Sequence, residues 1–308
     1  MQKKLIYIDT DVSLGTPGAE IDDGAAIILL LRNEKVKVAG VGSVFGNVPV
    51  QDATLNLDRL LTWLDGEDIP LGLGAARPLR TDMTWFEEWQ SGYEKTLDWT
   101  PRPTISSSAD LIIKTIADNP NQVSILALGP LTNLAVALQL DPRIVSLTQE
   151  VIVMGGSFQP QNPTPEFNVR CDPEAAQIVF SAGWNVHVLG LDLTRQVHFS
   201  RQDFTSLPNG NPAVELLRTQ APGWIRRVEQ MGWEQDGCSL HDAVAAAYLI
   251  DDSIFQSVEA SVEVELSGPN LYGVTRFSAV TKDRPVVRAV VGVETMKCRD
   301  LIWSYLEQ

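Results

Sequence analysis

Four aspartates lie close together near the N-terminus, in a pattern that suits metal or acid–base chemistry. Asp9 and Asp11 follow a short apolar run, and Asp22 and Asp23 open an apolar segment that ends at Arg32. Carboxylate oxygens are the ligands that hard divalent cations prefer, and a cation would offset the repulsion among four such groups. The alternative explanation is a helix whose first turn carries two acids that complement its dipole.

A second candidate pair, His241-Asp242, stands far along the chain at the start of another apolar segment. The alternative explanation here is an aspartate that caps a helix beside an incidental histidine. Cys238 precedes His241 with the spacing of half a zinc site, but Cys171 and Cys298 supply no second half, so the sequence argues against zinc. Sparse cysteines in odd number also favour a reducing, cytoplasmic compartment.

A parallel sheet is expected to position these residues, because β-rich runs alternate with helical segments. Strands are predicted at residues 5–8, 36–45, 123–128, 151–154, 184–191, 262–266 and 285–293. Helices are predicted at residues 22–32, 52–64, 107–118, 132–140 and 173–182, with a mostly helical excursion at 209–232. Near-continuous apolar strands indicate a sheet buried on both faces. The sequence therefore predicts an α/β fold, a single large domain over residues 1–308 with a mostly parallel, Rossmann-like central sheet flanked by helices.

Polar residues follow the predicted strands, at the edge where ligands bind in open parallel sheets. Asn47 follows the second strand, Thr132 the third and Gly155-Gly156 the fourth. Each residue alone is a weak signal, because strand ends are usually polar. Together with Asp9 and Asp11 after the first strand, they predict one site at this edge.

In order along the chain, these motifs resemble those of the inosine-uridine-preferring nucleoside hydrolases. The two aspartate pairs resemble the N-terminal cluster of that family, and Gly46-Asn47-Val48 resembles its asparagine after the second strand. Further segments that resemble the family are Leu131–Ala135, Met154–Gly156, Pro165–Asn168, Asp172–Ala176 and His241-Asp242. The matches follow the family order over essentially the whole chain, which makes the resemblance specific.

The resemblance implies Ca²⁺-dependent hydrolysis of the N-glycosidic bond of ribonucleosides, giving free base and ribose. Asp11 would act as general base on a Ca²⁺-bound water, and His241 would protonate the leaving base. The Ca²⁺ ligands would be Asp11, Asp23, the Thr132 carbonyl and Asp242. The substrate contacts would be Asp22, Asn47, Met154, Asn162, Glu166, Phe167, Asn168 and Asp242, although Asn162 lies closer to Glu166 than the family spacing. A homodimer or homotetramer is also implied.

The sequence departs from the family pattern in two places. About seven extra residues separate Asp11 from Asp22, within residues 12–20, whose glycines and proline suit a loop that bulges outward or covers the pocket. The region at 81–103 lacks the His-Gly signature of the family and carries tryptophans instead. We expect this region and residues 209–236 to form caps. At least one of Trp85, Trp89, Trp224 and Trp233 should contact the nucleobase, with a weak preference for purines.

The acidic composition excludes several classes of partner. The 308 residues carry 39 acidic and 24 Lys and Arg side chains, a formal net charge of −15. Nucleic acids and anionic membranes both need clustered positive charge, so neither is an expected partner. Two other functions stay open at this point: a non-catalytic nucleoside- or sugar-binding protein, and a phosphatase of the haloacid dehalogenase type, which also begins with a strand and Asp-x-Asp.

Overall fold

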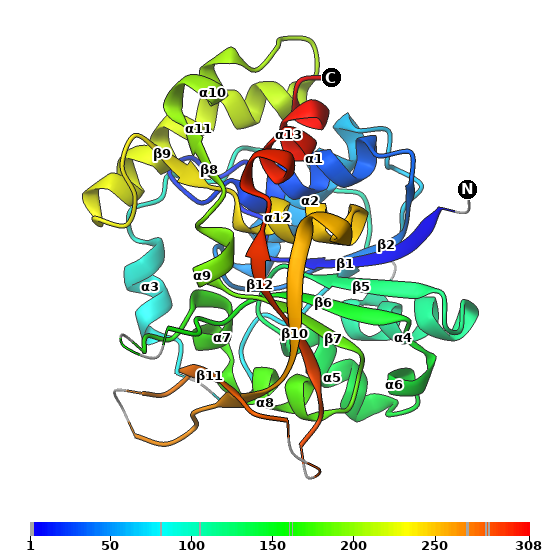
Figure 1. Cartoon of the computed structure of the whole chain (residues 1–308). Coiled ribbons are helices and arrows are strands. Elements are labelled where there is room, and N and C mark those ends of the chain that lie inside the picture. The colour runs from blue at the N-terminus through cyan, green and yellow to red at the C-terminus, as the bar shows by residue number, and fades with distance from the viewer. Residues whose placement is uncertain are drawn as a thin grey trace.

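A large sheet runs through the middle of the molecule (Figure 1). The structure is a computed structural model that describes residues 3–80, 82–104, 106–159, 161, 163–268, 271–280, 282 and 284–308, without the side chain of Glu87. The strand order is β11-β10-β12-β7-β6-β5-β1-β2-β3-β4. The strand bounds are β1 Lys4–Thr10, β2 Val36–Ser43, β3 Leu71–Leu73, β4 Ser106–Ser107, β5 Val123–Ala127, β6 Glu150–Met154, β7 Val186–Leu189, β10 Phe255–Val264, β11 Thr275–Ser278 and β12 Val287–Val293.

The sheet is mostly parallel, as predicted. All pairings from β12 across to β4 are parallel, whereas β10 pairs antiparallel with both β12 and β11. A separate antiparallel ribbon joins β8 (His198–Ser200) to β9 (Gly237–Ser239). Parallel neighbours place their carboxyl ends at one edge, which brings the segments after β1, β2, β5 and β6 together.

Helices cover both faces of the sheet (Figure 1). On one side lie α1 (Asp22–Arg32), α2 (Val50–Trp63), α11 (Pro212–Gln230), α12 (His241–Ile250) and α13 (Thr295–Leu306); on the other lie α4 (Ser108–Asp118), α5 (Thr132–Leu140), α6 (Ile144–Leu147) and α8 (Pro173–Ser181). The shorter helices are α3 (Thr84–Gln90), α7 (Phe167–Cys171), α9 (Leu191–Thr194), α10 (Arg201–Ser206) and the 3₁₀ turn η1 (Asp252–Ile254).

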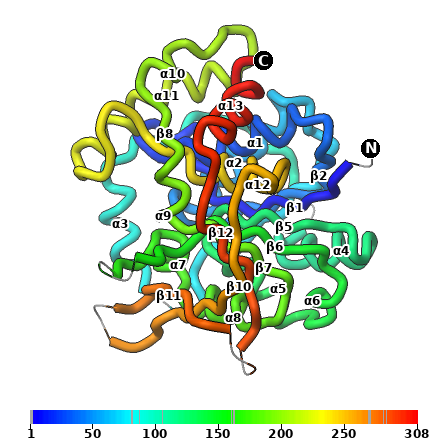
Figure 2. Tube along the Cα trace, viewed as in Figure 1, coloured from blue at the N-terminus to red at the C-terminus, as the bar shows by residue number. Residues whose placement is uncertain are grey.

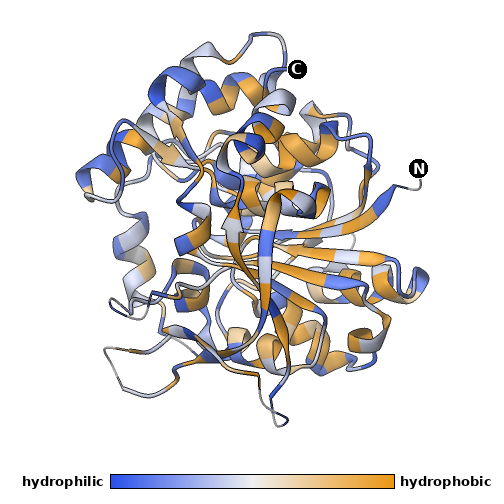
Figure 3. Ribbon diagram, in the orientation of Figure 1, coloured by the Kyte–Doolittle hydropathy of each residue, from blue (hydrophilic) through white to orange (hydrophobic). Residues whose placement is uncertain are grey.

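Two hydrophobic clusters form the main core, one on each face of the sheet. The larger cluster joins α1 to α12, so that segments from opposite ends of the chain pack side by side (Figure 2). Apolar residues are concentrated along the central strands and the inner helix faces (Figure 3). Burial of this kind on both faces explains why the parallel strands read as continuous apolar runs.

The helix predicted at residues 22–32 is confirmed with the same bounds, and Asp172 caps the predicted helix at Pro173 through a 3.1 Å bond from the Ala175 amide to Oδ1. The strand predicted at residues 262–266 is wrong in its bounds, because β10 begins at Phe255. Its first residues are half-buried or exposed and therefore lack an apolar run. The short strands β3 and β4, the strand β11 and the final helix α13 were not predicted.

Residues 82–103, the described part of the 81–103 region, contain one short helix, α3, within otherwise irregular chain, and the 209–236 region contains α11 and the turn after it. Both lie over the edge of the sheet where the carboxyl ends meet (Figure 1). None of the helices in the described chain is long and apolar enough to cross a membrane.

Candidate functional site

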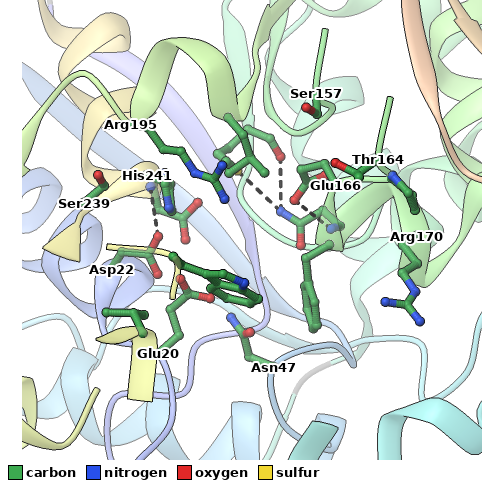
Figure 4. Close-up of a pocket in the computed structure, with 18 of the residues that line it drawn as sticks. Glu20, Asp22, Asn47, Ser157, Thr164, Glu166, Arg170, Arg195, Ser239 and His241 are labelled. Carbon is green, nitrogen blue, oxygen red and sulfur yellow. Dashed lines mark hydrogen bonds between the residues drawn. The ribbon is translucent and has the colours of Figure 1, made fainter. Parts of the chain in front are cut away.

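A pocket of about 330 Å³ opens at the carboxyl edge of the parallel strands. Its walls come from the segments after β1, β2 and β6, from α3, α7 and α11, and from the start of α12. Figure 4 shows Asp22 and His241 facing Glu166 and Arg170 across this space. The predicted catalytic residue His241 lines it, and so do the predicted substrate residues Asp22, Asn47, Met154, Glu166, Phe167, Asn168, Asp242, Trp85, Trp89, Trp224 and Trp233. Asn162 lies outside the described residues.

Three buried carboxylates meet at the floor of this pocket. Ligand atoms of Asp22, Asp23 and Asp242 lie within 4.8 Å of one another. The first two belong to the first turn of α1, and the third to the first turn of α12. The Asp242 amide donates to Asp22 Oδ2 at 3.3 Å, which fixes the two helix starts together. No side chain caps α1.

The carboxyl pKa values in this cluster are raised because burial disfavours the charged form. Burial, followed by the charge of Asp23, raises the pKa of Asp22 to about 8. Burial raises the pKa of Asp23 to about 6, against hydrogen bonds that include the Thr10 hydroxyl. The pKa of Asp242 is raised by burial and then by Asp22. An arrangement of this kind can hold a hard cation through oxygen, because a bound cation would favour all three ionised forms.

Asp11 lies beside this cluster, directly after the last residue of β1. The Asn47 amide donates to Asp11 Oδ2 at 2.7 Å, and Oδ1 is buried with no partner among the described residues. Burial and then the charge of Asp23 raise the pKa of Asp11. A buried carboxylate oxygen without a donor is costly unless a cation or an ordered water satisfies it. Its environment therefore suits either a metal ligand or a base.

Thr132 begins α5 and is buried, and it is not among the residues that line the pocket. Its hydroxyl donates to Asp172 Oδ2 at 2.7 Å, which orders the start of the helix. The neighbouring Asn133 donates from Nδ2 to Asp9 Oδ1 at 2.9 Å. Burial raises the pKa of Asp9 to about 8. The Asn133 side chain therefore links Asp9, near the end of β1, to the start of α5.

The segment at residues 165–168 builds the wall opposite α1. Glu166 accepts three backbone amides, from Gly156 (2.9 Å), Asn168 (2.8 Å) and Val169 (3.1 Å), and in doing so caps α7. Asn168 donates from Nδ2 to the Leu128 and Met154 carbonyls at 2.7 and 3.2 Å. Both side chains are held in one orientation before any ligand binds, which reduces the entropy cost of binding.

The four tryptophans form the outer part of the pocket together with Phe167. Trp89 stacks on Trp233 with ring centroids 5.8 Å apart, and its ring lies 4.9 Å from that of Phe167. Trp85 contacts Phe167 edge-on at 5.7 Å, and the Arg170 guanidinium lies 4.2 Å from the centre of its ring. Flat aromatic faces of this kind can stack a planar heterocycle.

His241 lines the pocket at the start of α12, and its Nδ1 lies 2.7 Å from the Thr194 hydroxyl. Burial lowers the pKa of the imidazole to about 4. The ring is therefore neutral at pH 7, and its Nε2 is left to hydrogen-bond rather than to deliver a proton from an imidazolium.

The other histidines and the three cysteines are not among the residues that line this pocket. His187 Nδ1 lies 2.9 Å from the Tyr248 hydroxyl inside the core, as expected of a structural histidine. His198 lies in β8 with Nδ1 3.0 Å from Glu234, a partner that the sequence did not reveal. Burial raises the pKa of the Cys238 thiol, so a Cys238 thiolate nucleophile is not favoured.

Four charged residues in the pocket were missed by the reasoning from sequence: Glu20, Arg170, Arg195 and Glu234. Glu20 ends the loop at residues 12–20, and a carboxylate two residues before Asp22 was the available signal. Arg170 lies in α7, whereas Arg195 and Glu234 lie outside helices and strands; none has a distinctive spacing, and only the folded chain brings them to the pocket. Figure 4 places Arg195 beside His241.

Comparison with known sequences agrees with the motif order. The model of the family described as inosine-uridine preferring nucleoside hydrolase matches residues 6–300. A probable uridine nucleosidase 2 from Oryza sativa subsp. japonica is 32% identical over 272 residues, covering 85% of this chain and 79% of the relative. The pyrimidine-specific ribonucleoside hydrolase RihA of Escherichia coli K12 is 31% identical over 299 residues, covering 93% and 95%.

Solved structures share the fold over nearly the full length. A plant nucleoside hydrolase, PpNRh1, superposes with a TM-score of 0.84 at 28% identity and covers 99% of both chains. A purine-preferring ribonucleoside hydrolase from Gardnerella vaginalis gives a TM-score of 0.85 at 22% identity, covering 99% of this chain and 98% of that one.

Proposed function

Because the chain belongs to the inosine-uridine preferring nucleoside hydrolase family and is a nucleoside hydrolase, we propose that it hydrolyses the N-glycosidic bond of ribonucleosides. Ca²⁺ would be bound at the carboxylate floor. The products are the free base and ribose. The observation that carries the proposal is the convergence of Asp22, Asp23 and Asp242 beneath a pocket with aromatic walls.

The residues present fit a calcium ion. Asp11, Asp23, Asp242 and the Thr132 carbonyl would hold it, and the unpartnered Oδ1 of Asp11 supports this assignment. Asp22 belongs to the same buried group and is proposed to face the ribose. When bound, a divalent cation lowers the pKa of a coordinated water and so favours the hydroxide nucleophile.

Asp11 is proposed as the general base. Its Oδ2 is fixed by the Asn47 amide, so the side chain cannot rotate away from the floor. A carboxylate held in place accepts the proton of the attacking water, a contribution that typically speeds reactions by roughly 10²- to 10⁴-fold. Attack by water from the floor, on the face of the ribose opposite the leaving nucleobase, would invert the configuration of the anomeric carbon.

The ribose is proposed to lie between the floor and the 165–168 wall. Its hydroxyls would contact Asp22, Asn47, Glu166, Asn168 and Asp242, with Met154 and Phe167 filling the remaining space. Positive charge develops on the sugar as the glycosidic bond breaks, and the surrounding carboxylates stabilise that charge. Multiple hydroxyl contacts also hold the anomeric carbon in position for attack.

The leaving base is proposed to stack on Trp85, Trp89, Trp224 or Trp233. A neutral His241 would donate a hydrogen bond to the departing base, since an imidazole with a pKa of about 4 carries no spare proton at pH 7. We further propose a cytoplasmic homodimer or homotetramer that salvages nucleosides. The two alternatives, a binding protein and a phosphatase, are not favoured by a family and relatives named as hydrolases.

The test is an assay of ribose release with the purified protein. Inosine, adenosine, uridine and cytidine are incubated with the enzyme before and after treatment with a chelator, and Ca²⁺ or Mg²⁺ is then added back. We expect ribose from at least one nucleoside, loss of activity on chelation, and recovery with Ca²⁺. No ribose from any of the four would reject hydrolysis, and full activity after complete metal removal would reject the role of Ca²⁺.

A further inference from the structure

The loop at residues 12–20 packs inward instead of bulging away from the molecule. Val12, Leu14 and Ala19 are buried in the core, and the Ser13 hydroxyl donates to the Glu20 carbonyl at 2.8 Å to close the loop. The loop therefore forms part of the protein interior up to the point where Glu20 enters the pocket.

Polar contacts fix this loop between α11 and the chain after α3. The Gly15 amide donates to Gln220 Oε1 at 2.9 Å, and the Gly15 carbonyl accepts from the Leu97 amide at 2.8 Å. The Pro17 carbonyl accepts from the Glu94 amide at 3.0 Å. Contacts to two separate elements hold the loop as a fixed wall, so its last residue has a defined position.

Glu20 reaches the pocket on the side where the aromatic cap begins. It lines the cavity together with Trp89 and Trp224, and Figure 4 shows it between Asp22 and Asn47. Its charge also acts on Tyr93 just after α3: burial raises the pKa of that hydroxyl, and Glu20 is the next largest cause. Glu20 therefore lies between the carboxylate floor and the tryptophans of the outer pocket.

The Glu20 carboxylate differs from the other two glutamates of the pocket in its hydrogen bonding. Glu166 accepts three backbone amides, and Glu234 Oε2 lies 3.0 Å from both His198 Nδ1 and Ser239 Oγ. No residue in the described chain donates a hydrogen bond to the Glu20 side chain. Its acceptors are free to face a ligand.

We propose that Glu20 is a specificity-determining residue whose carboxylate accepts a hydrogen bond from an N–H donor on the nucleobase. This inference rests on the proposed hydrolysis of nucleosides. The Trp89 side of the pocket is where a planar base would stack, and every common base presents an amino group or a ring N–H at its edge. An ionised carboxylate can only accept such bonds, so in that form it favours bases with a donor over bases without one.

The test compares matched substrate pairs that differ in this donor: adenosine with unsubstituted purine riboside, cytidine with the pyrimidin-2-one riboside, and uridine with 3-methyluridine. For each pair that the wild type hydrolyses, the ratio of kcat/KM for parent over analogue is measured in the wild type, Glu20→Gln and Glu20→Ala. We expect the ratio to fall roughly 10- to 100-fold in the variants, the size of one hydrogen bond to a charged group.

Glu94→Gln is the matched control, because Glu94 contacts the same loop through its backbone and is exposed outside this pocket. It should keep the wild-type ratio. An unchanged ratio in both Glu20 variants would overturn the inference. The inference would also be overturned if the effect of the Glu20 substitutions on kcat/KM disappeared with 5′-deoxyadenosine, because Glu20 would then contact a sugar hydroxyl. A wild type that releases no ribose would instead reject the proposed function, so the two failures are distinct.

Discussion

At the scale of single residues, the main feature is a group of carboxyls that share one buried space without a basic side chain among them. Asp11 shows this most clearly, because one of its oxygens has a backbone donor and the other has none among the described residues. A structural aspartate buried to this degree is normally satisfied by several donors. A buried carboxylate oxygen without a hydrogen-bond donor is typical of a group that binds a ligand.

Replacing Asp11 tests this assignment directly. Asp11→Ala removes the proposed base and a proposed metal ligand together, so we expect kcat to fall at least roughly 10²- to 10⁴-fold. Ribose release provides the rate, and thermal denaturation checks that the variant is folded. Asp68→Ala, which removes an exposed carboxylate that does not line the pocket, should keep the wild-type rate. A folded Asp11→Ala enzyme at full rate would exclude Asp11 as the base.

At the scale of elements, the loop at residues 12–20 depends on Gly15. Its backbone has a φ of +127°, and a Cβ there would lie 2.2 Å from both Arg59 Nη1 and Asn56 Oδ1. Both neighbours are buried, so they have little room to move. Glycine is required at this point by conformation and by space.

Gly15→Ala should therefore destabilise the protein more than conformation alone would. Gly210 supplies the matched control, because its φ is +120° and no atom lies within 4 Å of a Cβ built there. We expect a loss of about 1 kcal/mol in the free energy of unfolding for Gly210→Ala and about 3 kcal/mol for Gly15→Ala. Denaturant titration measures both. Equal losses of unfolding free energy in the two variants would show that the loop accommodates the added methyl group without strain from Arg59 and Asn56.

Some helices and site residues could be predicted from the sequence, and others could not. The helix at Asp22–Arg32 was predictable because two acids open a continuous apolar run, and Asp11 and Asn47 were predictable as residues that follow apolar strands. Glu20 could not be placed, because a loop rich in glycine and proline has no periodicity that tells inward from outward. The lowered pKa of His241 was equally hidden, since it arises from burial by residues distant in sequence.

At the scale of the whole molecule, the carboxylate floor links stability to pH and to metal. The pKa of Asp22 is raised to about 8 and that of Asp23 to about 6 in the folded protein, above the ordinary value of 3.8. A raised pKa means that the folded state binds protons that the unfolded state has lost. In the absence of metal, stability from these groups is full below about pH 4 and is lost as the pH rises through 6 and 8.

Added Ca²⁺ should reverse this trend, because it favours the ionised carboxylates. We expect the increase in Tm caused by Ca²⁺ to be larger at about pH 8 than at about pH 5. Differential scanning calorimetry of the chelated protein, with and without Ca²⁺, measures the increment at each pH. Asp23→Asn should reduce the increment at the higher pH. An increment that shrinks as the pH rises would contradict the assignment of these acids to a metal.

The meeting of α1 and α12 has a consequence for how the chain is made. The amide of Asp242 contacts a carboxylate of Asp22, 220 positions earlier in the sequence. While the N-terminal half is emerging from the ribosome, Asp242 has not yet been synthesised and cannot pack against Asp22 and Asp23. At that stage the two carboxyls are either hydrated and charged or protonated and neutral. A cation held between the two helices would act as a removable cross-link over this long loop, and it would form among the last contacts of folding.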